Sequence, residues 1–195
     1  NKGILSGPSV SYYDDNLNWM YQNYAKNVGV FICPATRNKV RTNLSLAGEI
    51  IDLQKFASNK EANGYSYENF SWWRKRAASE GAAEQKDGSS GIQLRKTEAR
   101  VASRPHTSVA DGLNLKDTIA GPSRTWLTLD GDNFYSADGV TRFNDYPDAA
   151  DNHGATGSHA NFCDGHAEWV RERGKYYHVL RELSQDEGVA DKHVP

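Results

Sequence analysis

The chain has 195 residues, of which 37% are hydrophobic, and its formal net charge is −2. This length and composition predict one soluble globular domain over residues 1–195, and the small charge excludes a global field that would attract nucleic acid or an anionic membrane. The longest apolar stretch is far shorter than the ~20 residues of a membrane-spanning helix. Because the chain begins with Asn1 and shows no signal-like segment, we expect a processed or truncated form.

The N-terminal part shows two helical patterns. The first follows a cap at Asp14 or Asp15, ends near Gly29 and has its apolar residues on one face: Leu17, Met20, Tyr21 and Tyr24. The second is shorter and consists of Leu46, Ile50, Leu53 and Ala57. Between them, residues 30–33 predict a short buried segment that ends at Pro34, because proline cannot donate to a strand ladder.

Aromatic residues dominate positions 65–73, which predicts a strand whose rings pack in the core. Trp72 and Trp73 also precede the basic triplet 74–76, a combination that could stack a base and contact phosphate. In a net acidic chain such a triplet is typical of a solvated strand end, so we expect no nucleic-acid partner. Residues 74–91 contain no apolar residue larger than alanine and predict an exposed excursion.

The second half of the chain is β-like from Pro122 onward. Residues 126–129 predict a strand, and the sequence "DGDN" that follows at 130–133 is rich in the oxygen ligands that calcium prefers. The stretch does not fit the EF-hand pattern, and acidic turns are also common without a metal.

The segment 153–170, "HGATGSHANFCDGHAEWV", contains three histidines, a cysteine and an Asp-Gly turn signal. A two-residue type I′ turn at Asp164 and Gly165 would pair Ala160 with Trp169. The core face would then consist of Ala160, Phe162, Ala167 and Trp169, and the opposite face of His159, Asn161, Cys163, His166 and Glu168. We expect residues 146–157 to cover that second, polar face.

Two cysteines, Cys33 and Cys163, are compatible with one long-range disulfide or with two separate buried thiols. Cys163 and His166 resemble a nucleophile and a base, but a hairpin lacks the electropositive surroundings that activate a thiol.

A metal site could draw its ligands from eight residues: Asp130, Asp132, Asp148, Asp151, His153, His159, Asp164 and His166. Histidines near a turn more often bond to loop carbonyls, which favours a structural role over a metal site or a catalytic site.

The sequence "YPDAADNHGATGSHANFCDGHAEWV", together with "GPSRTWLTLDGDN", "VFICPA" and "GYSYENFSWW", resembles prepilin-type proteins of the type II secretion pseudopilin kind that carry a C-terminal His-x9-Asp-Gly motif. His153, Asp164 and Gly165 match the motif, although ten residues rather than nine separate His153 from Asp164. The resemblance implies an α+β pilin-like head, with an N-terminal helix packed on an antiparallel sheet and long loops. It also implies a hydrophobic stem helix and polymerisation with other pilin-like subunits, and neither the stem nor a prepilin cleavage site is present in this sequence.

We therefore expect a non-enzymatic, exported structural subunit of the cell envelope, periplasm or cell surface, in contact with a membrane only through the missing segment. Export favours a disulfide between Cys33 and Cys163, and the secretion pseudopilins suggest calcium at Asp130, Asp132 or Asp148. The polar residues of 153–166 would hold a long loop over the sheet. Two alternatives remain: a metal-dependent enzyme that uses the residues from His153 to His166, and a glycan-binding or small-ligand-binding module built on Trp72, Trp73 and nearby aromatics.

Overall fold

A computed structural model describes residues 3–5, 15–57, 60–73, 85–86, 92–107, 112–131, 146–149, 151–171 and 174–185. The fold is α+β with antiparallel sheets, as predicted. The strands are β1 (Ser45–Leu46), β2 (Glu49–Ile50), β3 (Tyr67–Asn69), β4 (Trp72–Trp73), β5 (Gln85–Lys86), β6 (Ile92–Arg95), β7 (Trp126–Asp130), β8 (Gly157–Phe162) and β9 (Ala167–Arg171). The α-helices are α1 (Glu98–Ser103) and α2 (Lys175–Gln185), and short 3-10 helices occur at Val28–Phe31, Ile51–Leu53, Pro122–Arg124 and Gly154–Thr156.

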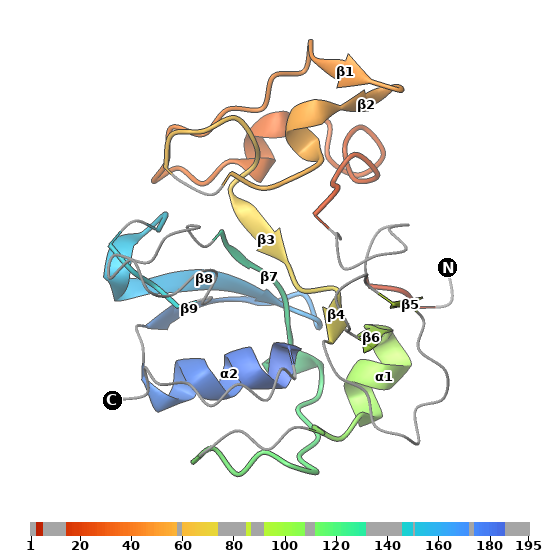
Figure 1. The fold of residues 1–195 in the computed structure, drawn as a ribbon, viewed down its shortest axis with the longest axis vertical. Helices are drawn as coiled ribbons and strands as arrows, with labels where there is room; N and C mark the ends of the chain where they lie inside the picture. Colours follow the sequence, from red (N-terminus) through yellow and green to blue (C-terminus); the bar gives the residue numbers. More distant parts are fainter. Residues whose placement is uncertain are drawn as a thin grey trace.

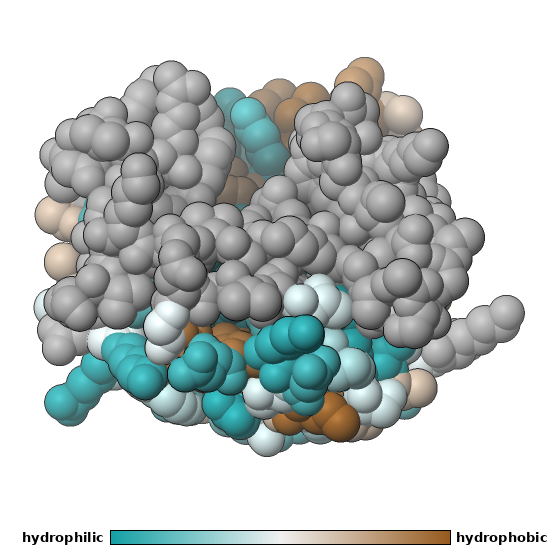
Figure 2. Space-filling view, turned by 60° about the horizontal axis from the view of Figure 1, so that its bottom comes forward, coloured by the Kyte–Doolittle hydropathy of each residue, from teal (hydrophilic) through white to brown (hydrophobic). Residues whose placement is uncertain are grey.

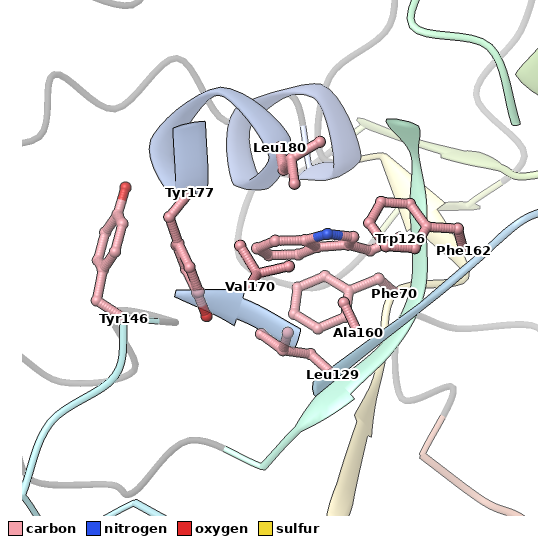
Figure 3. Close-up of a cluster of buried hydrophobic side chains, with 9 residues drawn as sticks. All are labelled: Phe70, Trp126, Leu129, Tyr146, Ala160, Phe162, Val170, Tyr177 and Leu180. Carbon is pink, nitrogen blue, oxygen red and sulfur yellow. The ribbon is translucent and has the colours of Figure 1, made fainter. Parts of the chain in front are cut away.

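The central element is a four-stranded sheet in the order β3-β7-β8-β9, and α2 lies along one of its faces (Figure 1). Figure 3 shows the core between them, in which the side chains of the sheet point toward the helix. Trp126 is fully buried there, and its ring makes edge contacts with Phe70 and Tyr177 at centroid distances of 6.0 and 5.1 Å. Tyr177, Leu180 and Leu183 recur every three residues and give α2 its buried face.

No helix in the described part of the chain is long and apolar enough to cross a membrane. Figure 2 shows that the described residues on the face turned forward are mostly hydrophilic, with hydrophobic ones in small separate groups.

The predicted helix from Leu17 to Tyr24 is wrong, because residues 15–57 contain no α-helix. The amide of Tyr24 still donates to the carbonyl of Met20, a helical spacing, but Gln22 has a φ of +66° and this conformation interrupts a right-handed helix. The apolar residues of this segment nevertheless pack together in the core. Leu17 is buried in a second cluster, with Phe31, Ile50, Leu53 and Tyr65, and Met20 and Tyr21 pack against it.

The second predicted helix is also wrong. Ala47 and Gly48 have φ values of +53° and +85° and join β1 to β2 in a tight hairpin, so Leu46 is 66% exposed. Residues 30–33 are buried only in part, since the chain enters a 3-10 helix that leaves Val30 exposed and Phe31 and Cys33 inside.

The aromatic segment at 65–73 forms two short strands, β3 and β4, as its composition predicted. Trp72 and Trp73 are buried, and β4 belongs to a three-stranded sheet in the order β4-β6-β5. Of the predicted excursion at 74–91, the structure describes only Gln85–Lys86, which is β5 and pairs with β6. The remainder, with the basic triplet 74–76, lies outside the described residues.

The β8–β9 hairpin turns at Asp164 and Gly165 as predicted, and Gly165 has a φ of +91°. Its loop contains three residues, however, and not two. The amide of Phe162 donates to the carbonyl of His166, and the amide of Gly165 donates to the carbonyl of Phe162, both at 2.9 Å. This pattern is a type I turn followed by a bulge glycine.

The extra loop residue shifts the strand register by one. Ala160 pairs with Glu168, and His159 pairs with Trp169. A shift of one residue exchanges the two faces of a strand, so the predicted core positions of β9 are wrong. Val170 is fully buried in the core, whereas Trp169 lies beside His159 on the opposite face.

Candidate functional site

Asp130 ends strand β7 and is buried between the two neighbouring strands. It pairs with Tyr67 of β3 on one side, and on the other its Oδ2 accepts the backbone amide of His159 at 2.7 Å. The side chain is 3% exposed. Within the described part of the chain, Oδ1 is buried without a hydrogen-bond partner. The carboxylate is therefore fixed at the end of the inner strand β7, with its Oδ1 still available for a further interaction.

His153 brings the loop before β8 onto the same place. It precedes the 3-10 turn Gly154–Thr156, and the neighbouring Asn152 anchors the loop by donating to the carbonyl of Ser66 at 2.7 Å. His153 Nε2 lies 3.2 Å from His159 Nδ1 and 3.5 Å from Asp130 Oδ2. The prediction that this loop covers the polar face of the hairpin agrees with these contacts.

Cys33 completes the cluster from a remote part of the sequence. Its Sγ lies 3.2 Å from His153 Nε2, although the two residues are 120 positions apart. The short 3-10 helix Val28–Phe31 and the extended residue Ile32 carry the chain to this point, where Cys33 is 1% exposed. We refer to Cys33, Asp130, His153 and His159 as the His153 cluster.

Trp169 forms one wall of the His153 cluster as a result of the shifted register. Its ring makes edge contacts with His153 and His159 at centroid distances of 5.3 and 4.7 Å. Gly157 makes this approach possible, because a Cβ built there would lie 2.9 Å from Cζ2 of the Trp169 ring. Sequence reasoning assigned Trp169 to the core and so missed its place beside the histidines.

Two kinds of chemistry are open to this arrangement. In the first, the Cys33 thiol donates to His153 Nε2 while His159 Nδ1–H donates to Asp130 Oδ2 at 3.3 Å, so that the cluster is a hydrogen-bonded lock. In the second, the ligand atoms of Cys33, Asp130 and His153, which all lie within 4.8 Å of one another, bind one cation. His159, with 53% of its side chain exposed, borders the group on the solvent side.

The electrostatics of the cluster favour a protonated thiol in the absence of a cation. Burial raises the pKa of Cys33, a backbone hydrogen bond from Ala35 lowers it, and the charge of Asp130 raises it further. Burial also raises the pKa of the neighbouring Tyr67 to about 12, with smaller contributions from Cys33 and Asp130. Negative charge is therefore unfavourable here unless a positive group enters.

The predicted disulfide is wrong, because both cysteines are free. Cys163 packs against the apolar cluster of Trp73, Leu94 and Val101, and its Sγ lies 3.8 Å from the carbonyl oxygen of Trp126. Cys33 instead contacts His153. The two thiols belong to different parts of the core, which explains why no bond joins them.

The contacts described for the remaining predicted site residues are local ones. Asp164 binds His166 at 2.6 Å in the hairpin turn, and this hydrogen bond lowers the pKa of Asp164. Asp151 Oδ2 accepts the amide of Asp148 at 2.7 Å, so this pair organises its own loop. Asp132 lies outside the described residues.

Burial also bears on two functions considered from the sequence, a Cys163 nucleophile and ligand stacking by Trp72 and Trp73. The pKa of the Cys163 thiol is raised, first by burial, which disfavours a nucleophile and base pair with His166, as the hairpin context already indicated. Trp72 and Trp73 are 6% and 2% exposed, so neither ring can stack on a ligand. A ligand-binding module would need other aromatics, and Trp19 and Tyr21 line an open hollow of about 680 Å³.

Comparison with known protein families, curated proteins and solved structures finds no match for this chain, so its function must be inferred from the His153 cluster itself.

Proposed function

We propose that this chain is a non-enzymatic structural subunit, the exported head of a pilin-like protein of the type II secretion pseudopilin kind. The His153 cluster would fasten the loop 151–157 to the sheet. The observation that carries the proposal is the set of contacts made by His153, which reaches Cys33, Asp130 and His159 from a loop with little regular structure. One side chain therefore connects its own loop and the adjacent strand β8 to two segments that are distant in the sequence.

The absence of an activated nucleophile among the described cysteines supports a structural role. Both thiols have raised pKa values, mainly through burial, and a protonated thiol is a poor nucleophile at neutral pH. The sheet and the matching residues His153, Asp164 and Gly165 agree with the resemblance, whereas the helix on the sheet is C-terminal rather than N-terminal. The proposed partners are other pilin-like subunits in the cell envelope, and no nucleic acid.

The structural role of the cluster is tested with His153→Ala. Loss of its hydrogen bonds leaves Asp130 and Cys33 buried with fewer partners, which costs about 1–3 kcal/mol. The melting temperature should fall by a few degrees for each kcal/mol. His166→Ala is the matched control, because this histidine bonds to Asp164 in the exposed turn and should have little effect. Equal melting temperatures for the two variants would contradict the structural role.

Assembly is tested with the complete gene product that contains this chain. It should be recovered with sheared surface filaments or with the inner membrane of a host that carries a type II secretion system. Recovery only as a soluble monomer in the periplasm or medium would contradict the pilin-like proposal.

The group of three possible ligands, Cys33, Asp130 and His153, favours a second candidate, a metal-dependent enzyme, because catalytic zinc takes three protein ligands and keeps one coordination position open. The zinc-supplemented protein should then hydrolyse an activated ester faster than its His153→Ala variant does. Equal rates would leave only the structural role.

A further inference from the structure

We propose that the His153 cluster binds one transition-metal ion of the Zn²⁺ class through Cys33 Sγ, the Asp130 carboxylate and His153 Nε2, with His159 Nδ1 beside the fourth position. This goes beyond the structural role, because the ion would bind whether or not the chain assembles into a filament. Sequence reasoning placed Asp130, His153 and His159 among eight candidate ligands but assigned Cys33 to a disulfide.

The ligand atoms of Cys33, Asp130 and His153 all lie within 4.8 Å of one another, which allows them to share one ion. Zinc bonds of about 2.0–2.3 Å require the ligand atoms to lie roughly 3.3–3.8 Å apart. His153 Nε2 lies 3.2 Å from Cys33 Sγ, 3.2 Å from His159 Nδ1 and 3.5 Å from Asp130 Oδ2, and His159 Nδ1 lies 3.3 Å from the same oxygen. These four distances are close to the ligand spacing, Cys33 Sγ lies within 4.8 Å of the Asp130 carboxylate, and His159 lies beside this three-residue group rather than within it.

The atoms around His153 Nε2 suit a cation as well as a proton. A sulfur, a nitrogen and a carboxylate oxygen surround this nitrogen. A thiol that donates to Nε2 and a His159 Nδ1–H that donates to Asp130 satisfy these atoms without a metal. A cation can take the place of these protons, because the thiolate, the carboxylate and the unprotonated imidazole each have a lone pair.

The carboxylate of Asp130 supplies an independent observation. Its side chain is 3% exposed, and in the described part of the chain Oδ1 is buried with no hydrogen-bond partner. A buried polar atom in this state costs about 1–3 kcal/mol. The cluster contacts Oδ2, so a metal ion there would satisfy Oδ1 only if the carboxylate binds through both oxygens, and in either case it would balance the charges of Asp130 and the Cys33 thiolate.

The ligand types select the ion. A thiolate, an imidazole and a carboxylate suit Zn²⁺ or Co²⁺, whereas Ca²⁺ takes six to eight oxygen ligands. The group that lies within 4.8 Å offers only one carboxylate. The calcium suggested by the resemblance therefore does not fit the His153 cluster. Three protein ligands leave a fourth position for His159 or a water molecule.

The test uses the chain after removal of metals with a chelator, titrated with Co²⁺ and then with Zn²⁺. One equivalent of Co²⁺ should produce the visible absorption of a tetrahedral ion and a thiolate-to-cobalt charge-transfer band, and Zn²⁺ should abolish both. Cys33→Ser should remove the charge-transfer band, while Cys163→Ser should retain it. His153→Ala and Asp130→Asn should weaken binding by more than about 100-fold, the upper range for changes outside the first ligand shell.

A wild-type chain that shows no cobalt spectrum, or that loses the band in Cys163→Ser rather than Cys33→Ser, would overturn the proposal. Because the wild-type spectrum is decisive alone, a variant that fails to fold leaves the test intact, and circular dichroism identifies such a variant. His159→Ala decides the fourth ligand, since a retained charge-transfer band with altered visible bands assigns His159 to the ion. Zinc binding without filament recovery would refute only the pilin-like role, and the reverse result would refute only the metal site.

Discussion

Gly157 offers the sharpest test of the geometry around the His153 cluster. It begins β8 with a φ of +149°, and a Cβ built there would lie 2.4 Å from the carbonyl oxygen of Val170 and 2.9 Å from Cζ2 of Trp169. Ordinary contacts between carbon and a carbonyl oxygen are about 3.3 Å or longer. The oxygen belongs to the backbone of the neighbouring strand, so it cannot move without disturbing the β8–β9 ladder.

Gly157→Ala should therefore destabilise the fold strongly. Overpacking costs about 1–3 kcal/mol and the unfavourable φ about 1–3 kcal/mol more, which gives about 4 kcal/mol in the middle of the range. For a chain of this size, the melting temperature should fall by about 8–16 °C. Urea denaturation measures the same loss as a lower midpoint with an unchanged slope.

Gly154→Ala is the matched control. Gly154 has a φ of +70°, and a Cβ added there would have nothing within 4 Å, so only backbone strain of about 1–2 kcal/mol is expected. Equal midpoints for the two variants would refute the close approach of β8, Val170 and Trp169, and with it the place of Trp169 beside the cluster.

Two other predictions concern the turn and a partly buried carboxyl group. Gly165→Val should cost about 1–3 kcal/mol from its φ of +91° alone, because nothing lies within 4 Å of the new Cβ, and an unchanged thermal midpoint would contradict the bulge turn. Burial raises the pKa of Asp15 to about 6 despite hydrogen bonds from Asn69, so the folded state binds a proton more tightly than the unfolded state does. Stability should therefore fall as the pH rises from about 4 to 6, and Asp15→Asn should remove this loss, which is on the order of 3 kcal/mol. Denaturation curves at pH 4 and pH 7 measure it, and a parallel pH dependence in the variant would show that Asp15 is not its source.

The hairpin shows how far sequence reasoning can reach. The Asp-Gly signal located the turn, but the dipeptide fits both a two-residue loop and a three-residue loop with a bulge glycine. The choice depends on which residues the core accepts. Val170 fills the space under α2, whereas the larger Trp169 fits against the histidines, and this packing decides the register.

The predicted N-terminal helix shows the same limit, because its apolar spacing was recognised but the path of its backbone was not. Leu17, Met20 and Tyr21 have helical spacing and do pack into one cluster, but the chain reverses at Gln22, whose positive φ has no sequence signal. The helix on the sheet could have been found at the other end of the chain, from the spacing of Tyr177, Leu180 and Leu183.

The candidate site was predictable in part. His153, His159 and Asp130 were recognised by residue type and by their closeness in the β-rich half of the chain. Cys33 was not, because no local pattern indicates a neighbour 120 positions away.

The topology of the central sheet determines the order in which this cluster can form. Only β8 and β9 are joined by a short turn, whereas β3 must reach β7, and Cys33 must reach His153, across long stretches of chain. Closing a longer loop costs more entropy, and contacts between distant residues slow folding. We expect the β8–β9 hairpin to form before the transition state and the contact with Cys33 after it. Substitutions in the hairpin should therefore slow folding, and substitutions at Cys33 should mainly accelerate unfolding.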